Sequence, residues 1–65
     1  MRSIERMEPF LQQIEEIWKT KCPDWRFGQL MFNFISAMGD PFYWEEDTFI
    51  AMLKKYFEIQ EKEKQ

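Results

Sequence analysis

The sequence predicts an all-α protein, a small three-helix bundle with an aromatic loop between the second and third helices. Three observations predict this class. Valine is absent, so the composition favours helix over sheet. Apolar residues recur three and four positions apart in three separate stretches, which is the spacing of one helical face. Proline and glycine fall between these stretches, where they end helices.

The first helix is expected near residues 8–21. Pro9 is tolerated only in a first turn, and Cys22-Pro23 ends the helix because proline disfavours helical geometry in the residue before it. Residues 1–6 are expected to be frayed or loosely attached. The apolar face consists of Met7, Phe10, Leu11, Ile14, Ile17 and Trp18.

The second helix is expected near residues 25–38, with Asp24 as its N-cap and Gly39 as its left-handed C-terminal residue. Gly28 costs helix stability, so it predicts a close approach of another helix. Two faces of this helix are apolar. The first face consists of Phe27, Leu30, Met31, Phe34 and Met38, and the second consists of Trp25 and Phe32.

The aromatic loop is the segment Pro-Phe-Tyr-Trp at residues 41–44, which is expected to fold back on the helices. The third helix is expected near residues 46–60, and a charged tail at 61–65 is expected to fray. Glu45, Glu46 and Asp47 lie at the start of this helix, where the helix dipole favours carboxylates. We therefore expect a single domain over residues 1–65, with an ordered part over about 7–60. Its predicted core consists of Phe10, Ile14, Ile17, Trp18, Leu30, Phe34, Phe49, Leu53 and Phe57.

Composition excludes several classes of function. The chain has no histidine and one cysteine, so zinc sites built on His and Cys, catalytic triads and intrachain disulfides are excluded. The net charge is −3 with the acidic residues concentrated in the middle, which argues against binding of DNA or RNA. Neither a signal peptide nor a membrane span is indicated, so a cytoplasmic protein is expected.

Two groups of residues have a structural and a chemical interpretation. Residues 45–47 could hold a divalent metal, but three consecutive residues of a helix point 100° apart, so complementation of the dipole is favoured. Cys22 is either a small buried apolar residue or a nucleophile, and the absence of histidine favours burial. We predict no catalytic, metal-binding or cofactor-binding residue, and no cofactor.

Trp25 and Phe32 allow two interpretations, which stay open at this point. In one, the second helix lies in the middle of the bundle and buries both rings. In the other, the rings form an exposed patch that contacts a protein partner, since aromatic residues are enriched in interface cores. The predicted partner-binding residues are Trp25, Arg26, Phe32, Tyr43 and Trp44.

Two strings of residues resemble a known signature. They are Pro-Asp-x-Arg-Phe-Gly-Gln-Leu at 23–30 and Asp-Pro-Phe-Tyr-x-Glu-Glu-Asp at 40–47. Together with Ile17-Trp18, they resemble a family of small uncharacterised proteins of bacteria and their phages, over residues 7–57. The first string resembles, to a lesser degree, the YihD family of small bacterial proteins. The resemblance implies a compact helical protein of bacterial or phage origin and assigns no catalytic residue.

Two functions follow from these observations. The favoured one is a small non-enzymatic protein-interaction module, a homodimer or a phage-borne or bacterial accessory or inhibitor protein, acting through an aromatic surface. The alternative is an acidic decoy of nucleic acid that occupies a basic groove on a nuclease or DNA-binding protein. Salt distinguishes them, since only the decoy complex weakens steeply with ionic strength. The decoy would use Asp24, Asp40, Glu45, Glu46 and Asp47.

Overall fold

The computed structural model describes residues 2–63 and confirms the all-α, three-helix class. A 3-10 turn at Ile4–Arg6 leads into α1 (Met7–Lys21), which is followed by α2 (Phe27–Met38) and α3 (Glu46–Glu63). No strand occurs in the described part of the chain. The predicted ranges are correct to within a few residues at each end.

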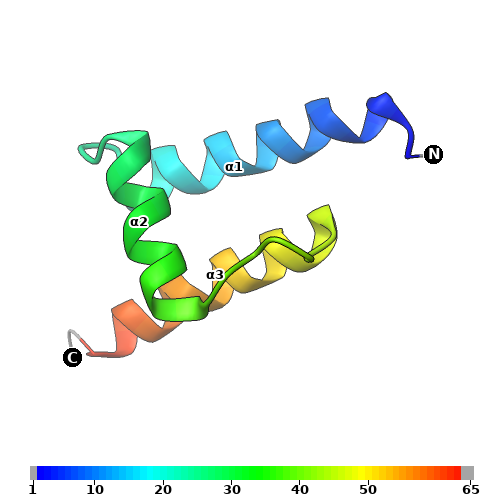
Figure 1. Cartoon of the computed structure of the whole chain (residues 1–65). Coiled ribbons are helices and arrows are strands. Elements are labelled where there is room, and N and C mark those ends of the chain that lie inside the picture. Colours follow the sequence, from blue (N-terminus) through cyan, green and yellow to red (C-terminus); the bar gives the residue numbers. More distant parts are fainter. Residues whose placement is uncertain (1, 64–65) are drawn as a thin grey trace.

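α1 and α3 lie side by side and run in the same direction, with α2 across one end (Figure 1). Two ion pairs show the parallel register. Arg6 pairs with Glu46 near the start of the two helices, and Lys21 pairs with Glu61 near their ends. Both pairs join residues that are 40 positions apart in sequence. The connection over residues 39–45 carries the chain back to the start of α3, which makes the parallel arrangement possible (Figure 1).

α3, and not α2, is the middle helix of the packing. It contacts α1 along one side and α2 along another, whereas the direct contact between α1 and α2 is slight. Of the two interpretations left open for Trp25 and Phe32, the one that places the second helix between the other two is therefore wrong. The physical reason is that α3 buries four apolar residues within about two turns: Ile50, Leu53, Tyr56 and Phe57 are all buried.

The core is a cluster of aromatic rings around Phe34. This side chain is fully buried, and its ring centroid lies 5.1 Å from that of Phe49 and 6.0 Å from those of Trp44 and Tyr56. Edge-to-face pairs at these distances add stability beyond that of the buried area. All nine residues of the predicted core belong to the buried cluster or pack directly against it.

α2 begins two residues later than predicted, and Asp24 is not its N-cap. The N–H of Trp25 donates to the carbonyl of Cys22 at 3.0 Å, so residues 22–25 form a turn. Arg26 is the N-cap residue, and its N–H donates to the side-chain oxygen of Gln29 at 2.8 Å. The turn places the Trp25 ring against Phe57 of α3, with ring centroids 6.4 Å apart.

The backbone conformation requires a glycine at position 39 but not at position 28. Gly39 ends α2 with a φ of 103°, which confirms the predicted need for a positive φ. Gly28 lies in the first turn of α2, and a Cβ atom added there would meet nothing within 4 Å. The expected close approach of another helix at Gly28 is therefore absent among the described residues.

Both ends of the described chain are more firmly attached than expected. Arg2 pairs with Glu45, and Arg6 pairs with Glu46, so the segment before α1 is tied to the start of α3. α3 continues three residues beyond the predicted end at Gln60. The rest of the predicted tail, residues 64–65, lies outside the described residues.

Candidate protein-interaction surface

Three aromatic rings are the most exposed of the chain's described aromatic side chains. Tyr43 is 89% exposed, Phe42 is 77% exposed and Phe32 is 72% exposed. Phe42 and Tyr43 stack edge to face with centroids 4.8 Å apart. Exposing an apolar ring to water is unfavourable, and aromatic residues are enriched in protein interfaces. Exposed fractions as high as these are therefore of interest as a candidate contact surface.

The structure separates the predicted partner-binding residues into two groups. Trp25 and Trp44 are half-buried, and their rings pack on core rings. Trp18 Nε1 also donates a hydrogen bond to the Trp25 carbonyl at 2.9 Å, which fixes the turn before α2. Phe32 and Tyr43 are exposed. Trp25 and Phe32 therefore do not form one exposed pair.

Arg26, the fifth predicted residue, is exposed at the start of α2. Its guanidinium makes no ion pair with the side chains that the structure describes. It therefore remains available as a positive group at the edge of a contact.

α2 carries no charged residue, which distinguishes it from the other two helices. Eight of its twelve residues are exposed to solvent, so burial within the chain does not explain this composition. The polar side of a surface helix ordinarily carries charged residues. The exposed side of α2 therefore differs from that of an ordinary surface helix.

One stripe of α2 is apolar and uncovered. It consists of Gly28, Phe32 and Ile35, at spacings of four and three residues, together with Gly39, the C-cap residue that follows the helix, and we call it the α2 stripe. All four residues are exposed. Sequence reasoning missed Ile35 here and Phe42 in the loop, although the lack of charge from 27 to 39 was a signal that could have identified the stripe.

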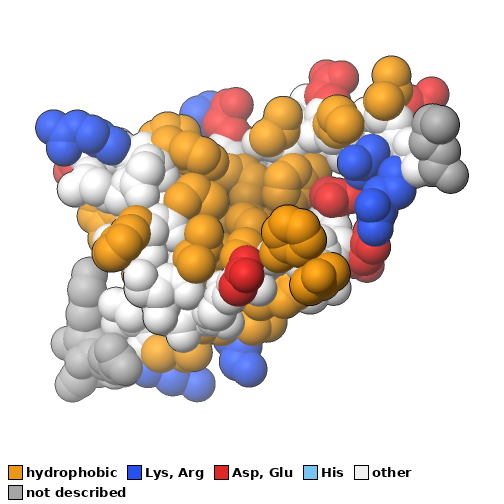
Figure 2. Space-filling model, viewed as in Figure 1, with side chains coloured by type: hydrophobic (Ala, Val, Ile, Leu, Met, Phe, Trp, Pro, Cys, Tyr) orange, Lys and Arg blue, Asp and Glu red, His pale blue; other side chains and the backbone are white. Residues whose placement is uncertain are grey.

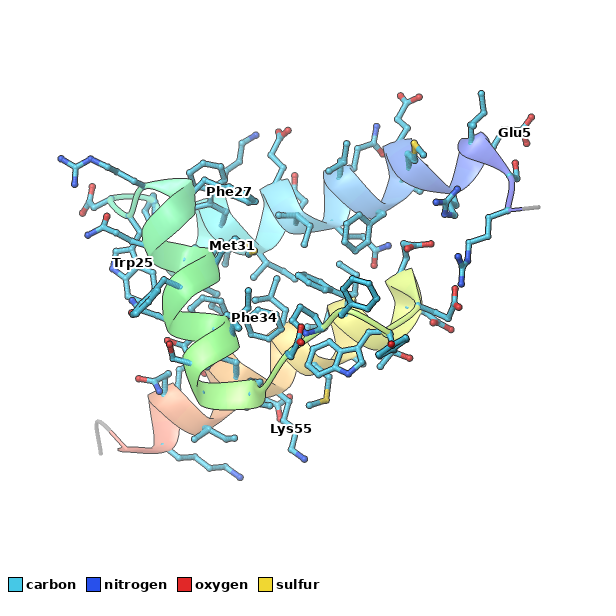
Figure 3. All side chains as sticks on the ribbon, viewed as in Figure 1. Glu5, Trp25, Phe27, Met31, Phe34 and Lys55 are labelled. Atoms are coloured by element: carbon cyan, nitrogen blue, oxygen red, sulfur yellow. The ribbon has the colours of Figure 1, made fainter. Side chains whose placement is uncertain are left out.

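The figures show how this surface relates to the helices. Phe27 and Met31 lie on the side of α2 toward α1, Phe34 points into the core, and Trp25 lies on the other side of α2 (Figure 3). Hydrophobic side chains spread across the same view of the surface, from α1 over α2 to the connection before α3, while most charged groups gather toward the edges (Figure 2). The apolar surface thus extends beyond the α2 stripe.

The carboxylates at the start of α3 are largely used within the fold. Arg2 donates two hydrogen bonds to Glu45, which lower the pKa of that carboxyl below its ordinary value. Arg6 donates to Glu46 at 2.7 Å, and the Asp47 side chain accepts the N–H of Thr48 at 2.8 Å. The described residues contain no group of three or more Asp, Glu, His or Cys side chains placed to hold a metal ion.

Cys22 is a buried residue that ends α1 and joins the core cluster. Burial raises the pKa of its thiol, which disfavours the reactive thiolate. The environment is that of a small apolar residue, as the structural interpretation of the sequence expects.

A groove of about 340 Å³ lies between α1 and α3. Its floor includes Ile17 and Phe57, and its rim carries Lys and Glu side chains of both helices. The rim of this groove carries charges of both signs, whereas the α2 stripe carries none.

Comparison with known proteins identifies no relative of this chain, so functional inference starts from its surface. No family model, curated protein or solved structure matches the chain. The resemblance in the two strings at 23–30 and 40–47 stays a prediction. Over residues 2–63, no helix is both long enough and apolar enough to cross a membrane.

Proposed function

We propose that this chain is a small, non-enzymatic protein-interaction module of a bacterial or phage cytoplasm. It binds protein through the α2 stripe and through Phe42 and Tyr43 of the connection that follows α2. The observation that carries the proposal is the exposed, charge-free surface of α2, and the two most exposed rings of the chain's described residues follow it in sequence.

The energetics support a contact surface. An aromatic side chain can bury roughly 150 to 250 Å² on contact. Phe32, Phe42 and Tyr43 keep most of that area in water. Rings of this kind at the centre of an interface each contribute on the order of 2 kcal/mol or more to binding.

The absence of enzymatic activity is part of the proposal. The sequence has no histidine to act as a general base, and its one thiol is buried. The exposed α2 stripe consists only of apolar residues and glycine, which can bind but cannot transfer protons.

The acidic decoy receives less support from the structure than the interaction module. A decoy needs free carboxylates arranged like phosphates, but Glu45 and Glu46 are already paired with Arg2 and Arg6. The surface available for contact is therefore more apolar than acidic.

The test is capture of protein partners from a bacterial lysate by tagged wild type and by two variants. Phe32→Ala combined with Tyr43→Ala removes two exposed rings. Ile59→Ala is the matched control, because Ile59 is a partly exposed apolar residue of α3 and belongs neither to the α2 stripe nor to the connection. We expect binding, either to itself or to another protein, to be lost in the double variant and retained in the control.

Salt provides the second arm of the test. An apolar contact should persist between about 0.1 and 1 M salt, whereas screening should disrupt a decoy complex. Binding that survives loss of both rings but disappears in high salt would contradict the proposal and favour the decoy.

A further inference from the structure

We propose that the partner of the α2 stripe is a second copy of this chain, with the two α2 helices packed antiparallel across a two-fold axis. This inference rests on the proposed function and names the partner. The axis passes through the middle of α2, between Asn33 and Phe34. Three features of α2 favour this partner: the spacing of the stripe, the glycine at position 28 and the distribution of charge.

The spacing of the stripe matches a coiled-coil seam. Intervals of four and three residues, from Gly28 through Phe32 to Ile35, are those of the a and d positions of a heptad, which face a neighbouring helix. In an antiparallel pair centred between Asn33 and Phe34, Phe32 packs on Ile35 of the second copy. The same register places Gly28 beside the C-terminal end of α2 of the second copy.

This arrangement explains why position 28 is a glycine. Glycine in a helix costs roughly 1 kcal/mol relative to alanine. Nothing in the described chain lies within 4 Å of where its Cβ would be. In the dimer, glycine at both ends of the seam lets the two backbones approach closely, so that the short seam buries Phe32 and Ile35.

Charge favours a second copy over an unrelated surface, and antiparallel over parallel packing. A two-fold interface places a surface against itself, so like charges on it would repel, and α2 carries none. Arg26 precedes α2 and Asp40 follows it. Antiparallel packing brings each Arg26 to Asp40 of the other copy, whereas parallel packing would bring the two arginines together.

Asp40 is able to take this role. One of its carboxylate oxygens accepts the N–H of Phe42 at 3.0 Å, which fixes the side chain beside the end of α2. Both Asp40 and Arg26 are exposed, and neither has an ion pair among the described residues.

The experiment measures dimer dissociation by sedimentation equilibrium for the wild type, Arg26→Asp and Asp40→Arg, each alone, and for an equal mixture of the two variants. Each variant alone places two like-charge pairs in the dimer. We expect its dissociation constant to rise roughly fivefold to thirtyfold. In the mixture both pairs become attractive again, so heterodimers should form with nearly wild-type affinity.

Folding is controlled within the same set. Aspartate is a favoured N-cap, so Arg26→Asp should keep α2 intact, and circular dichroism of the dilute proteins checks both variants. A mixture that dimerises no better than the variants alone would overturn the antiparallel register.

A second outcome separates this inference from the proposed function. If the wild type stays monomeric up to about 1 mM but ring-dependent capture of another protein persists, the second copy is wrong and the interaction module stands. If neither self-association nor capture depends on Phe32 and Tyr43, both fail.

Discussion

α2 and α3 are both rich in apolar residues, yet they use them differently. α3 buries Ile50, Leu53, Tyr56 and Phe57 and places lysine and glutamate on its exposed side. α2 buries Leu30 and Phe34 but exposes Phe27, Phe32 and Ile35, with no charged residue on any side.

The difference shows which helix has the amphipathic composition of a surface helix. α3 packs its apolar side on α1 and α2, and its exposed side carries the charged residues expected of a helix in contact with water. The exposed side of α2 carries Phe27, Phe32 and Ile35 and no charged residue. Contact with another protein chain would give α2 the burial that α3 obtains within its own fold.

The largest expected effect is on the core side of α2. Phe34→Ala should lower the free energy of unfolding by about 3 to 5 kcal/mol, because the ring is fully buried among three others. Urea unfolding measures this loss. A loss below about 1 kcal/mol would show that the ring cluster is not the centre of the core.

An intermediate effect is expected at Trp25. Trp25→Ala should lower the free energy of unfolding by roughly 2 kcal/mol, about half the cost for a fully buried ring, since this ring is half-buried against Phe57. Chemical denaturation of the dilute variant tests this. If stability is unchanged but partner binding is lost, Trp25 belongs to the contact surface after all.

A gain in stability is expected at Gly28. Gly28→Ala should raise the free energy of unfolding of the dilute chain by up to about 1 kcal/mol, since the added methyl group meets only open space. The same change should weaken self-association. Thermal melts at low concentration and sedimentation at high concentration measure the two effects, and a variant that is both more stable and more strongly dimeric would argue against close approach of the helices.

The smallest effect concerns pH. Burial raises the pKa of the Cys22 thiol above its ordinary value of 9.0, so the folded chain holds this proton more tightly than the unfolded chain. The resulting stability is fully present below about pH 9 and is lost as the pH rises through the pKa of the folded state. Tyr56 acts in the same direction at higher pH, because burial also raises its pKa. Urea midpoints from about pH 8 to 10 should fall less steeply for Cys22→Ala than for wild type. Equal slopes would contradict the burial of the thiol.

Much of the fold follows from the spacing of apolar residues. That spacing predicts the helix class, three helices and every member of the expected core, because each depends on local periodicity. The prolines and Gly39 mark where α1 and α2 end for the same local reason.

Other features depend on contacts between distant segments and could not be read from one stretch of sequence. Asp24 has the right side chain for an N-cap, but the packing of Trp25 on Phe57 moves the start of α2 past it. The parallel register of α1 and α3 depends on pairs such as Arg6 with Glu46, which lie 40 residues apart. The separation of Trp25 from Phe32 follows from the same turn.

The most direct test of the account is the free energy of unfolding of Phe32→Gln, compared with wild type at high dilution. Glutamine keeps helix propensity and removes only the exposed ring. We predict that the two dilute proteins agree within about 0.5 kcal/mol, and that only the wild type gains thermal stability as its concentration rises. A loss of about 2 kcal/mol or more in the dilute variant would place Phe32 in the core and contradict the account.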